Sequence, residues 1–119
     1  MSWTDFGKEF LAQCTMGETD LTTLTLNIKV GDDNTAFDVT QTDLQGINTA
    51  EKGMISGFPT RTGNEIQLSA EFLRLEANFD WLEWGIFDDG GNMYYRKVED
   101  NGIKQNDENR VFNPIIKAG

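Results

Sequence analysis

Carboxylates are the most abundant chemically reactive side chains of this chain, and one of them has apolar neighbours. Glu83 follows Leu82 and precedes Trp84 in the stretch richest in aromatic and aliphatic residues. An inward-pointing carboxyl in such surroundings would be a candidate general acid. Glycoside hydrolysis also needs a second carboxylate at a set distance across a sugar-sized cleft. Asp80 and Asp88 are available for this role, but no distinctive spacing marks them.

The structural interpretation of Glu83 is simpler, and we prefer it. The side chain would face solvent or form an ion pair with Arg74 or Arg96. The chain contains no histidine, which excludes a Ser-His-Asp triad, and its one cysteine, Cys14, lacks a histidine partner and is expected to be buried. We therefore expect no catalytic residue and no enzymatic activity. The alternative of another class is a carbohydrate-binding or hydrolytic domain that uses Glu83.

Two acidic turns offer oxygen ligands of the kind that Ca²⁺ prefers. They are the stretch from Asp32 through Asp38 and the stretch from Asp88 through Asn92. Neither matches the ligand spacing of an EF-hand loop, and Asp, Asn and Gly are also the ordinary residues of turns. We therefore expect two turns, with no metal and no other cofactor.

The charge balance narrows the range of partners. Twenty acidic residues face ten basic ones, for a net charge of −10. Such a surface repels phosphate backbones and anionic membranes, so neither nucleic acid nor a membrane is expected as a partner, whereas basic protein surfaces are favoured. No apolar run reaches the roughly 18 residues that a membrane span needs, and the first residues do not resemble a signal peptide. We expect synthesis and assembly in a reducing cytoplasm.

The N-terminal segment predicts a short helix or arm over residues 1–16. Its apolar residues follow a 3.6-residue period, and Thr4 or Asp5 could cap it. Gly7 inside the pattern weakens the helix by about 1 kcal/mol relative to Ala. The apolar stripe consists of Trp3, Phe6, Phe10, Leu11 and Cys14.

The rest of the chain predicts strands, because apolar and polar residues alternate between Gly-rich turns. We expect hairpin turns at residues 88–91 and at Asn101–Gly102. Residues 32–52 predict a long loop, with a short helical turn after Asp43, and loops of this length are often functional. Pro114 indicates that the last strand lies at a sheet edge. The predicted strands are 24–30, 54–58, 65–75, 81–87, 93–98 and 111–116.

These elements predict one mainly β domain over residues 1–119. The strand number and turn spacing are typical of an antiparallel β-sandwich or a partly open barrel, with the short N-terminal helix packed across one end or face. A chain of this length is enough for one domain and can bury a sizeable core without disulfides.

The order of motifs resembles small structural proteins of tailed phages, such as head-coating proteins and tail-collar or tail-fibre modules. The feature that carries the resemblance is a strand with Glu, one intervening residue, Gly, an aliphatic residue and Phe, followed by a hairpin and a strand ending in Arg. In this sequence the motif consists of Trp81, Glu83, Trp84, Gly85, Phe87 and Arg96.

The resemblance implies a virion structural protein, most naturally a capsid decoration or cement protein that binds the assembled head shell. The implied partners are the major capsid protein or other virion proteins, and a homo-oligomer, with a trimer favoured. A tail or tail-fibre attachment component is the alternative. The terminal arms and the long loop would make the contacts, and the candidate partner-binding residues are Trp3, Phe6, Phe10, Asp33, Phe37, Asp43 and Leu44.

Overall fold

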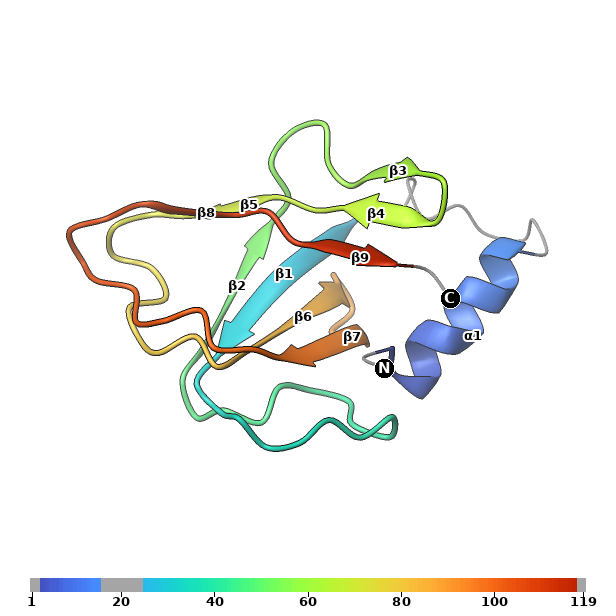
Figure 1. The fold of residues 1–119 in the computed structure, drawn as a ribbon, viewed down its shortest axis with the longest axis horizontal. Helices are drawn as coiled ribbons and strands as arrows, with labels where there is room; N and C mark the ends of the chain where they lie inside the picture. Colours follow the sequence, from blue (N-terminus) through green and yellow to red (C-terminus); the bar gives the residue numbers. More distant parts are fainter. Residues whose placement is uncertain (1–2, 16–24, 118–119) are drawn as a thin grey trace.

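The computed structural model describes residues 3–15 and 25–117, without the side chains of residues 13–15 (Figure 1). The helix α1 spans Asp5–Thr15. Thr4 caps it, because its hydroxyl accepts a hydrogen bond from Gly7 N at 3.0 Å and donates one to Met93 O at 2.6 Å. The predicted helix is therefore confirmed. The environment expected for the Cys14 side chain lies outside the described residues.

Helix α1 packs directly against strand β7, which spans Met93–Val98. Phe6 and Phe10 both meet Tyr94 edge to face, with ring centroids 5.0 and 4.9 Å apart. Gly7 permits this approach, because a Cβ atom there would overlap the Tyr94 carbonyl oxygen. The glycine that lowers helix propensity is thus the residue that lets the helix lie against the sheet.

The larger sheet has the antiparallel order β2-β1-β6-β7. Strand β1 spans Leu26–Gly31, β2 spans Thr49–Gly53 and β6 spans Glu83–Asp88. The predicted turn at 88–91 joins β6 to β7 and is confirmed. All of β6 from residue 83 to residue 87 is buried, so both faces of the sheet are covered along this central strand.

A second layer is a two-stranded ribbon, which we define as residues 65–72 paired with residues 110–117. It contains β4 (Glu65–Gln67), β5 (Ala70–Phe72), β8 (Arg110–Phe112) and β9 (Ile115–Lys117). The register is the same on both sides of a break, since β4 pairs with β9 and β5 with β8 in one continuous antiparallel order. Both strands are interrupted together, where Leu68 N donates to Pro114 O.

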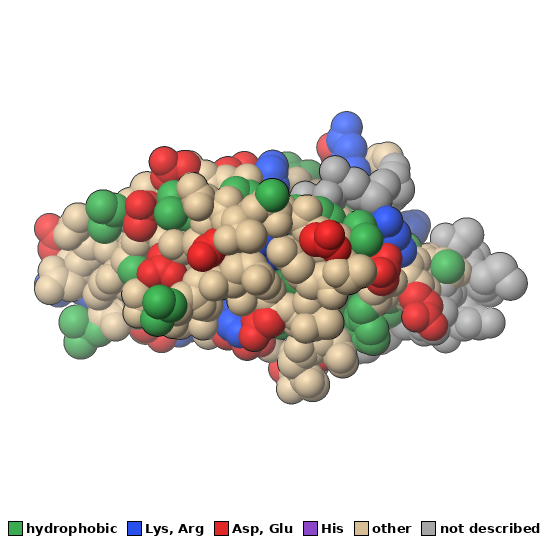
Figure 2. Space-filling model, turned by 90° about the horizontal axis from the view of Figure 1, so that it is seen from below, with side chains coloured by type: hydrophobic (Ala, Val, Ile, Leu, Met, Phe, Trp, Pro, Cys, Tyr) green, Lys and Arg blue, Asp and Glu red, His purple; other side chains and the backbone are tan. Residues whose placement is uncertain are grey.

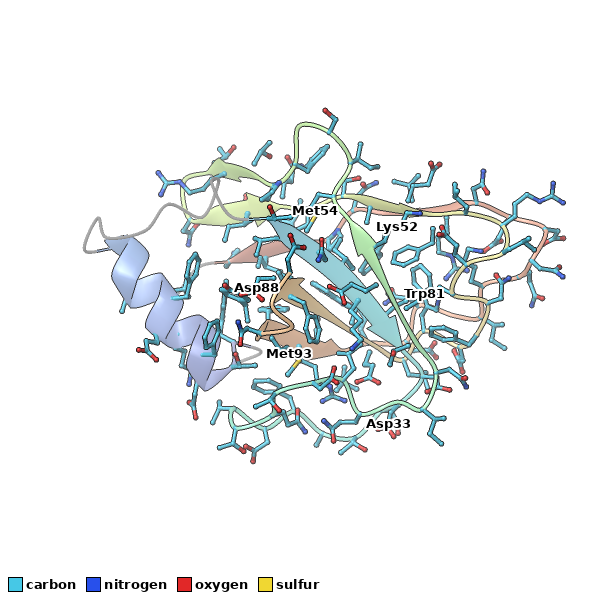
Figure 3. The ribbon with its side chains drawn as sticks, turned by 180° about the vertical axis from the view of Figure 1, so that it is seen from behind. Asp33, Lys52, Met54, Trp81, Asp88 and Met93 are labelled. Atoms are coloured by element: carbon cyan, nitrogen blue, oxygen red, sulfur yellow. The ribbon has the colours of Figure 1, made fainter. Side chains whose placement is uncertain are left out.

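The core lies between the larger sheet and the ribbon, with aromatic rings at its centre (Figure 3). Trp81 meets Phe72 and Phe112 edge to face at 5.0 and 5.8 Å, and Trp84 meets Phe112 at 5.3 Å. The Trp3 indole N–H donates to Lys117 O at 2.8 Å and so joins the N-terminal segment to β9. The predicted mainly β domain with one short N-terminal helix is confirmed, and the two layers form a partly open sandwich.

Several predicted boundaries are wrong. Residues 49–53, expected in the long loop, form β2 because β1 offers them a complete antiparallel partner. The expected strand 54–58 is absent, because Phe58 N bonds back to Ile55 O and closes a turn. Strand β3 instead spans Thr60–Thr62 and pairs with β4. Residues 32–48 contain no helical turn.

The C-terminal expectations also need correction. Asn101–Gly102 is not a hairpin turn, because residues 99–103 continue beside residues 80–82, with Asn101 N donating to Trp81 O at 2.8 Å. The predicted strands 65–75 and 111–116 exist as the ribbon, but each is divided in two. Pro114 lies in that division opposite Leu68, and because it has no N–H it cannot return the hydrogen bond that its carbonyl oxygen accepts from Leu68 N.

Candidate functional site

The most polar buried feature is an ion pair between two strands of the larger sheet. Glu83 begins β6 and Arg96 lies on β7, and both side chains are fully buried. Arg96 Nε donates to Glu83 Oε1 at 2.9 Å. The second guanidinium nitrogen, Nη1, donates to Gln41 Oε1 at 3.1 Å, whereas Nη2 has no hydrogen-bond partner among the described residues. Of the two arginines considered for Glu83, the structure thus selects Arg96.

The Glu83 carboxylate also binds the backbone of the loop that covers this face of the sheet, which we call the acidic loop and define as residues 32–48. Oε1 accepts from Gln45 N at 2.9 Å. Oε2 accepts from Gly46 N at 2.7 Å and from Asp33 N at 3.3 Å. One buried carboxylate therefore connects the outgoing and returning arms of the loop.

Two glycines leave the space that this carboxylate occupies. A Cβ atom on Gly31 would overlap the Glu83 carboxylate. A Cβ atom on Gly46 would lie 2.8 Å from Glu83 Oε2 and 2.7 Å from Asp32 N. Both distances are too short for a real side chain, so the loop and the carboxylate fit only with glycine at these positions.

Other contacts hold the acidic loop along its length. Asp32 accepts from Asn48 N at 3.2 Å and from Asn48 Nδ2 at 2.8 Å, which closes the base of the loop. Lys29 forms an ion pair of 2.9 Å with Asp43. Leu44 is buried against Phe87 and Met93 in a small apolar cluster of its own; its exposed fraction is 6%.

This geometry favours the structural interpretation of Glu83 over the hydrolytic one. The carboxylate faces a guanidinium and three backbone N–H groups, so both oxygens are engaged within the chain. Breaking such a pair would leave an uncompensated buried charge. What the arrangement can do is fix the conformation of a long loop.

The two acidic turns use their carboxylates for their own backbone. Hydrogen bonds from the side chain and the backbone of Thr35 hold the pKa of Asp33 below its ordinary value. Thr40 lowers the pKa of Asp38 in the same way. Among residues 3–12 and 25–117, no group of three or more acidic or Cys side chains is placed to hold a metal ion.

Asp88 plays the equivalent part in the turn between β6 and β7. It accepts hydrogen bonds from Gly90 N at 2.9 Å, from Asn92 N at 3.0 Å and from the Tyr94 hydroxyl at 2.9 Å. Partial burial acts to raise the pKa of Asp88, but the hydrogen bonds from Asn92 and Tyr94 outweigh it and lower the pKa.

A groove of about 250 Å³ lies between the start of α1, the acidic loop and the turn that follows β6. Phe6 is its aromatic wall and is 44% exposed. Several of its polar groups are already engaged, since Gln41 bonds Arg96 and Asn92 bonds Asp88. The lining consists of Asp5, Phe6, Thr40, Gln41, Thr42, Gly91, Asn92 and Met93.

Several large apolar side chains are exposed to solvent at the end of the ribbon farthest from α1. Leu75 is 86% exposed on the turn after β5. Buried Lys104 holds this turn, because its ammonium group donates to Leu73 O and to Asn78 Oδ1, each at 2.8 Å. The other exposed apolar residues of this end are Leu73, Ile103 and Val111.

The predicted partner-binding residues divide into two groups. Trp3, Phe10 and Leu44 are core residues, each 6% exposed, which corrects the expectation that they form a surface for a partner. The structure leaves the side chains of Phe6, Asp33, Phe37 and Asp43 at least partly accessible. The motif residues Trp81, Glu83, Trp84, Gly85, Phe87 and Arg96 are all buried in or beside β6 and β7.

Sequence reasoning missed the most exposed apolar residue of the acidic loop. Ile47 is 97% exposed. The only sequence signal is an isoleucine between Gly46 and Asn48, two residues typical of turns. Lys104 was also missed, because nothing in the sequence distinguishes a buried lysine from an exposed one.

Comparisons of the chain with protein-family models, with curated protein sequences and with solved structures gave no match. Within the described residues, the structure contains no helix that is both long and apolar enough to cross a membrane.

Proposed function

We propose that this chain is a structural protein of a tailed-phage particle, and that it binds the assembled head shell as a decoration protein. The observation that carries a binding role is the exposed apolar end of the ribbon. Leu75 is 86% exposed on a turn that is fixed from inside by Lys104. When a partner covers this leucine, apolar surface leaves water and the free energy falls. Because the turn is already rigid, little conformational entropy is lost on binding.

The buried polar groups support binding rather than catalysis. Glu83 and Arg96 bind each other and the loop that covers them. The accessible carboxylates of Asp33 and Asp38 accept hydrogen bonds from backbone N–H groups of their own turns. The placement on a phage particle comes from the sequence resemblance around Glu83 and Gly85. The mechanism is mass action, since a protein that binds only the assembled shell stabilises that shell.

Assembly on a symmetric shell multiplies weak contacts. A trimer at a three-fold position would present three copies of each surface, and effective concentration would raise the overall affinity above that of one copy. The net charge of −10 favours encounter with basic partners, which makes the association rate dependent on ionic strength.

The first test is the composition of purified particles of the phage that encodes the chain. Quantitative mass spectrometry of separated heads and tails should find the chain in many copies on heads. A few copies on tails alone would instead support a tail attachment role. Absence from both would overturn the proposal.

The solution mass, measured by light scattering, tests the oligomeric part separately. A trimer of the 13.4 kDa chain is the expected species. A monomer would mean that neighbours assemble only on the particle, and it would remove the trimer from the proposal without removing the binding role.

A further inference from the structure

The acidic loop carries one large apolar side chain that is almost fully exposed and that the fold of the loop does not require. Ile47 is 97% exposed, the highest value among the large apolar side chains that the structure describes. Its neighbours are fixed on both sides. Gly46 N donates to buried Glu83 at 2.7 Å, and Asn48 donates to Asp32 through its backbone and its side chain. Ile47 therefore projects from a backbone that is held in one conformation.

We propose that the acidic loop is a pre-organised recognition element, and that Ile47 enters an apolar pocket on another protein whose rim carries Lys and Arg side chains. This inference rests on the proposed binding role and names a contact surface and the chemistry of the partner for it. The proposed contact surface is separate from the exposed apolar end of the ribbon.

The rigidity of the loop supports the first half of the proposal. A flexible loop of this length would lose conformational entropy on docking, which lowers affinity. Here the entropy is lost on folding, because the buried Glu83–Arg96 pair connects to the loop through Gln41, Gln45 and Gly46. A buried ion pair is a costly way to hold a surface loop, and a requirement for one fixed loop conformation would explain it.

The charge of the acidic loop predicts which side chains surround the pocket on the partner. Residues 32–48 contain four Asp and neither Lys nor Arg. Lys29, on β1, offsets Asp43, whereas Asp33 and Asp38 have a lowered pKa and stay ionised near neutral pH. Figure 2 views the molecule from the side on which this loop lies, and acidic side chains recur across that face. A partner surface with Lys and Arg around an apolar centre is complementary to it.

The same charge argues against the other occupants of this surface. Two copies of the chain facing each other through this loop would bring eight Asp side chains together, of which Lys29 pairs with one, Asp43, in each copy. Anionic lipid headgroups and nucleic-acid phosphates would be repelled in the same way. A different, basic protein is the occupant that fits.

The test uses heads and tails purified separately from cells infected with a phage whose gene for this chain carries an early stop codon. Purified full-length chain is added back, and binding is measured by co-sedimentation over a range of protein concentrations. The variant is Ile47→Asp, and the matched control is Ile115→Asp, which alters a residue that is 55% exposed on the ribbon. Thermal unfolding of both variants checks that they fold.

We expect Ile47→Asp to weaken binding by at least about tenfold while the control binds as the wild type does. Raising the salt concentration should weaken wild-type binding, because the rim contacts are ionic. Wild-type affinity in a folded Ile47→Asp chain would overturn this inference and leave the proposed function intact. Failure of the wild-type chain to bind heads or tails would overturn both.

Discussion

On one face of the larger sheet, Ile28, Val30 and Trp84 are buried against the ribbon and are at most 2% exposed. On the opposite face, Glu83 and Arg96 are equally buried, but beneath the acidic loop and with charged, directional contacts. The two faces belong to the same sheet, and along β6 the alternation of side chains places Glu83 on one face and its neighbour Trp84 on the other. Equal burial is thus achieved by two different kinds of interaction.

The difference has a consequence for how each face tolerates change. Apolar packing is non-directional, so the inner face depends mainly on volume and shape. The outer face depends on hydrogen-bond geometry, because Glu83 must reach Arg96 and three loop N–H groups at once. Substitutions on the inner face should weaken the whole domain, whereas those on the outer face should first release the acidic loop.

The largest expected effect is on the inner face. Trp84→Ala removes a ring that meets both Phe112 and Tyr95, with centroids 5.3 Å away in each case. We expect the free energy of unfolding to fall by about 3–5 kcal/mol, measured by urea denaturation. Leu75→Ala, at a residue that is 86% exposed, is the control and should stay within about 0.5 kcal/mol of the wild type. A small loss for Trp84→Ala would mean that this face is not the main source of stability.

Glu83→Gln should cost about 3 kcal/mol, because it leaves the buried Arg96 without its counter-charge. The distinguishing measurement is amide hydrogen exchange. Protection should be lost at Gln45 and Gly46 before it is lost in β1 and β6, since Glu83 accepts both loop amides. Uniform loss of protection across the sheet would contradict the separation of the two faces.

Gly46→Ala should lower stability by about 1–3 kcal/mol, because the new Cβ would lie 2.7 Å from Asp32 N and force the loop to move. Gly53→Ala is the matched control in the neighbouring strand β2. Its Cβ would meet nothing closer than Asn27 Oδ1 at 3.7 Å, so we expect no loss and a gain of up to about 1 kcal/mol. Equal effects of the two substitutions in thermal unfolding would show that the loop does not need the glycine.

The smallest expected effect is that of Asp88, whose carboxylate is only partly buried. Asp88 has a pKa below its ordinary value of 3.8, so its contribution is fully present above that value and is lost as the pH falls through the folded pKa. Asp88→Asn should therefore cost about 1 kcal/mol near neutral pH, after discounting for solvent screening. The difference from the wild type should shrink below about pH 4 in denaturation curves. A difference that grows on acidification would mean that the hydrogen bonds do not favour the ionised carboxylate.

Much of the fold followed from local patterns. Alternating apolar residues predicted β1 and the pair β6 and β7, and the Asp-Gly-rich turn predicted their connection, because these signals arise within short stretches. The helix was predictable for the same reason, whereas the choice of Thr4 over Asp5 as its cap came from the structure. The local sequence could not show β2, because Thr49–Gly53 has no apolar alternation and becomes a strand only through pairing with β1.

The site was less predictable than the fold. The sequence singled out Glu83 and offered Arg74 and Arg96 as partners, but the choice between two cations depends on which strand lies beside β6. It marked the region 32–52 as functional without distinguishing buried Leu44 from exposed Ile47. In an irregular loop, side chains do not alternate with a fixed period, so the sequence does not indicate which of them point inward.

By itself, the sequence determined that the chain is acidic, mainly β and without the histidines that much enzyme chemistry uses, since composition and periodicity act locally and additively. Only the tertiary structure decided which charges are buried, which loop they hold and which apolar residues remain in water. Those properties depend on contacts between residues tens of positions apart, such as Glu83 with Gly46 and Arg96 with Gln41. The free energy of a buried charge is set by all of its neighbours together, and that environment exists only once the chain has folded.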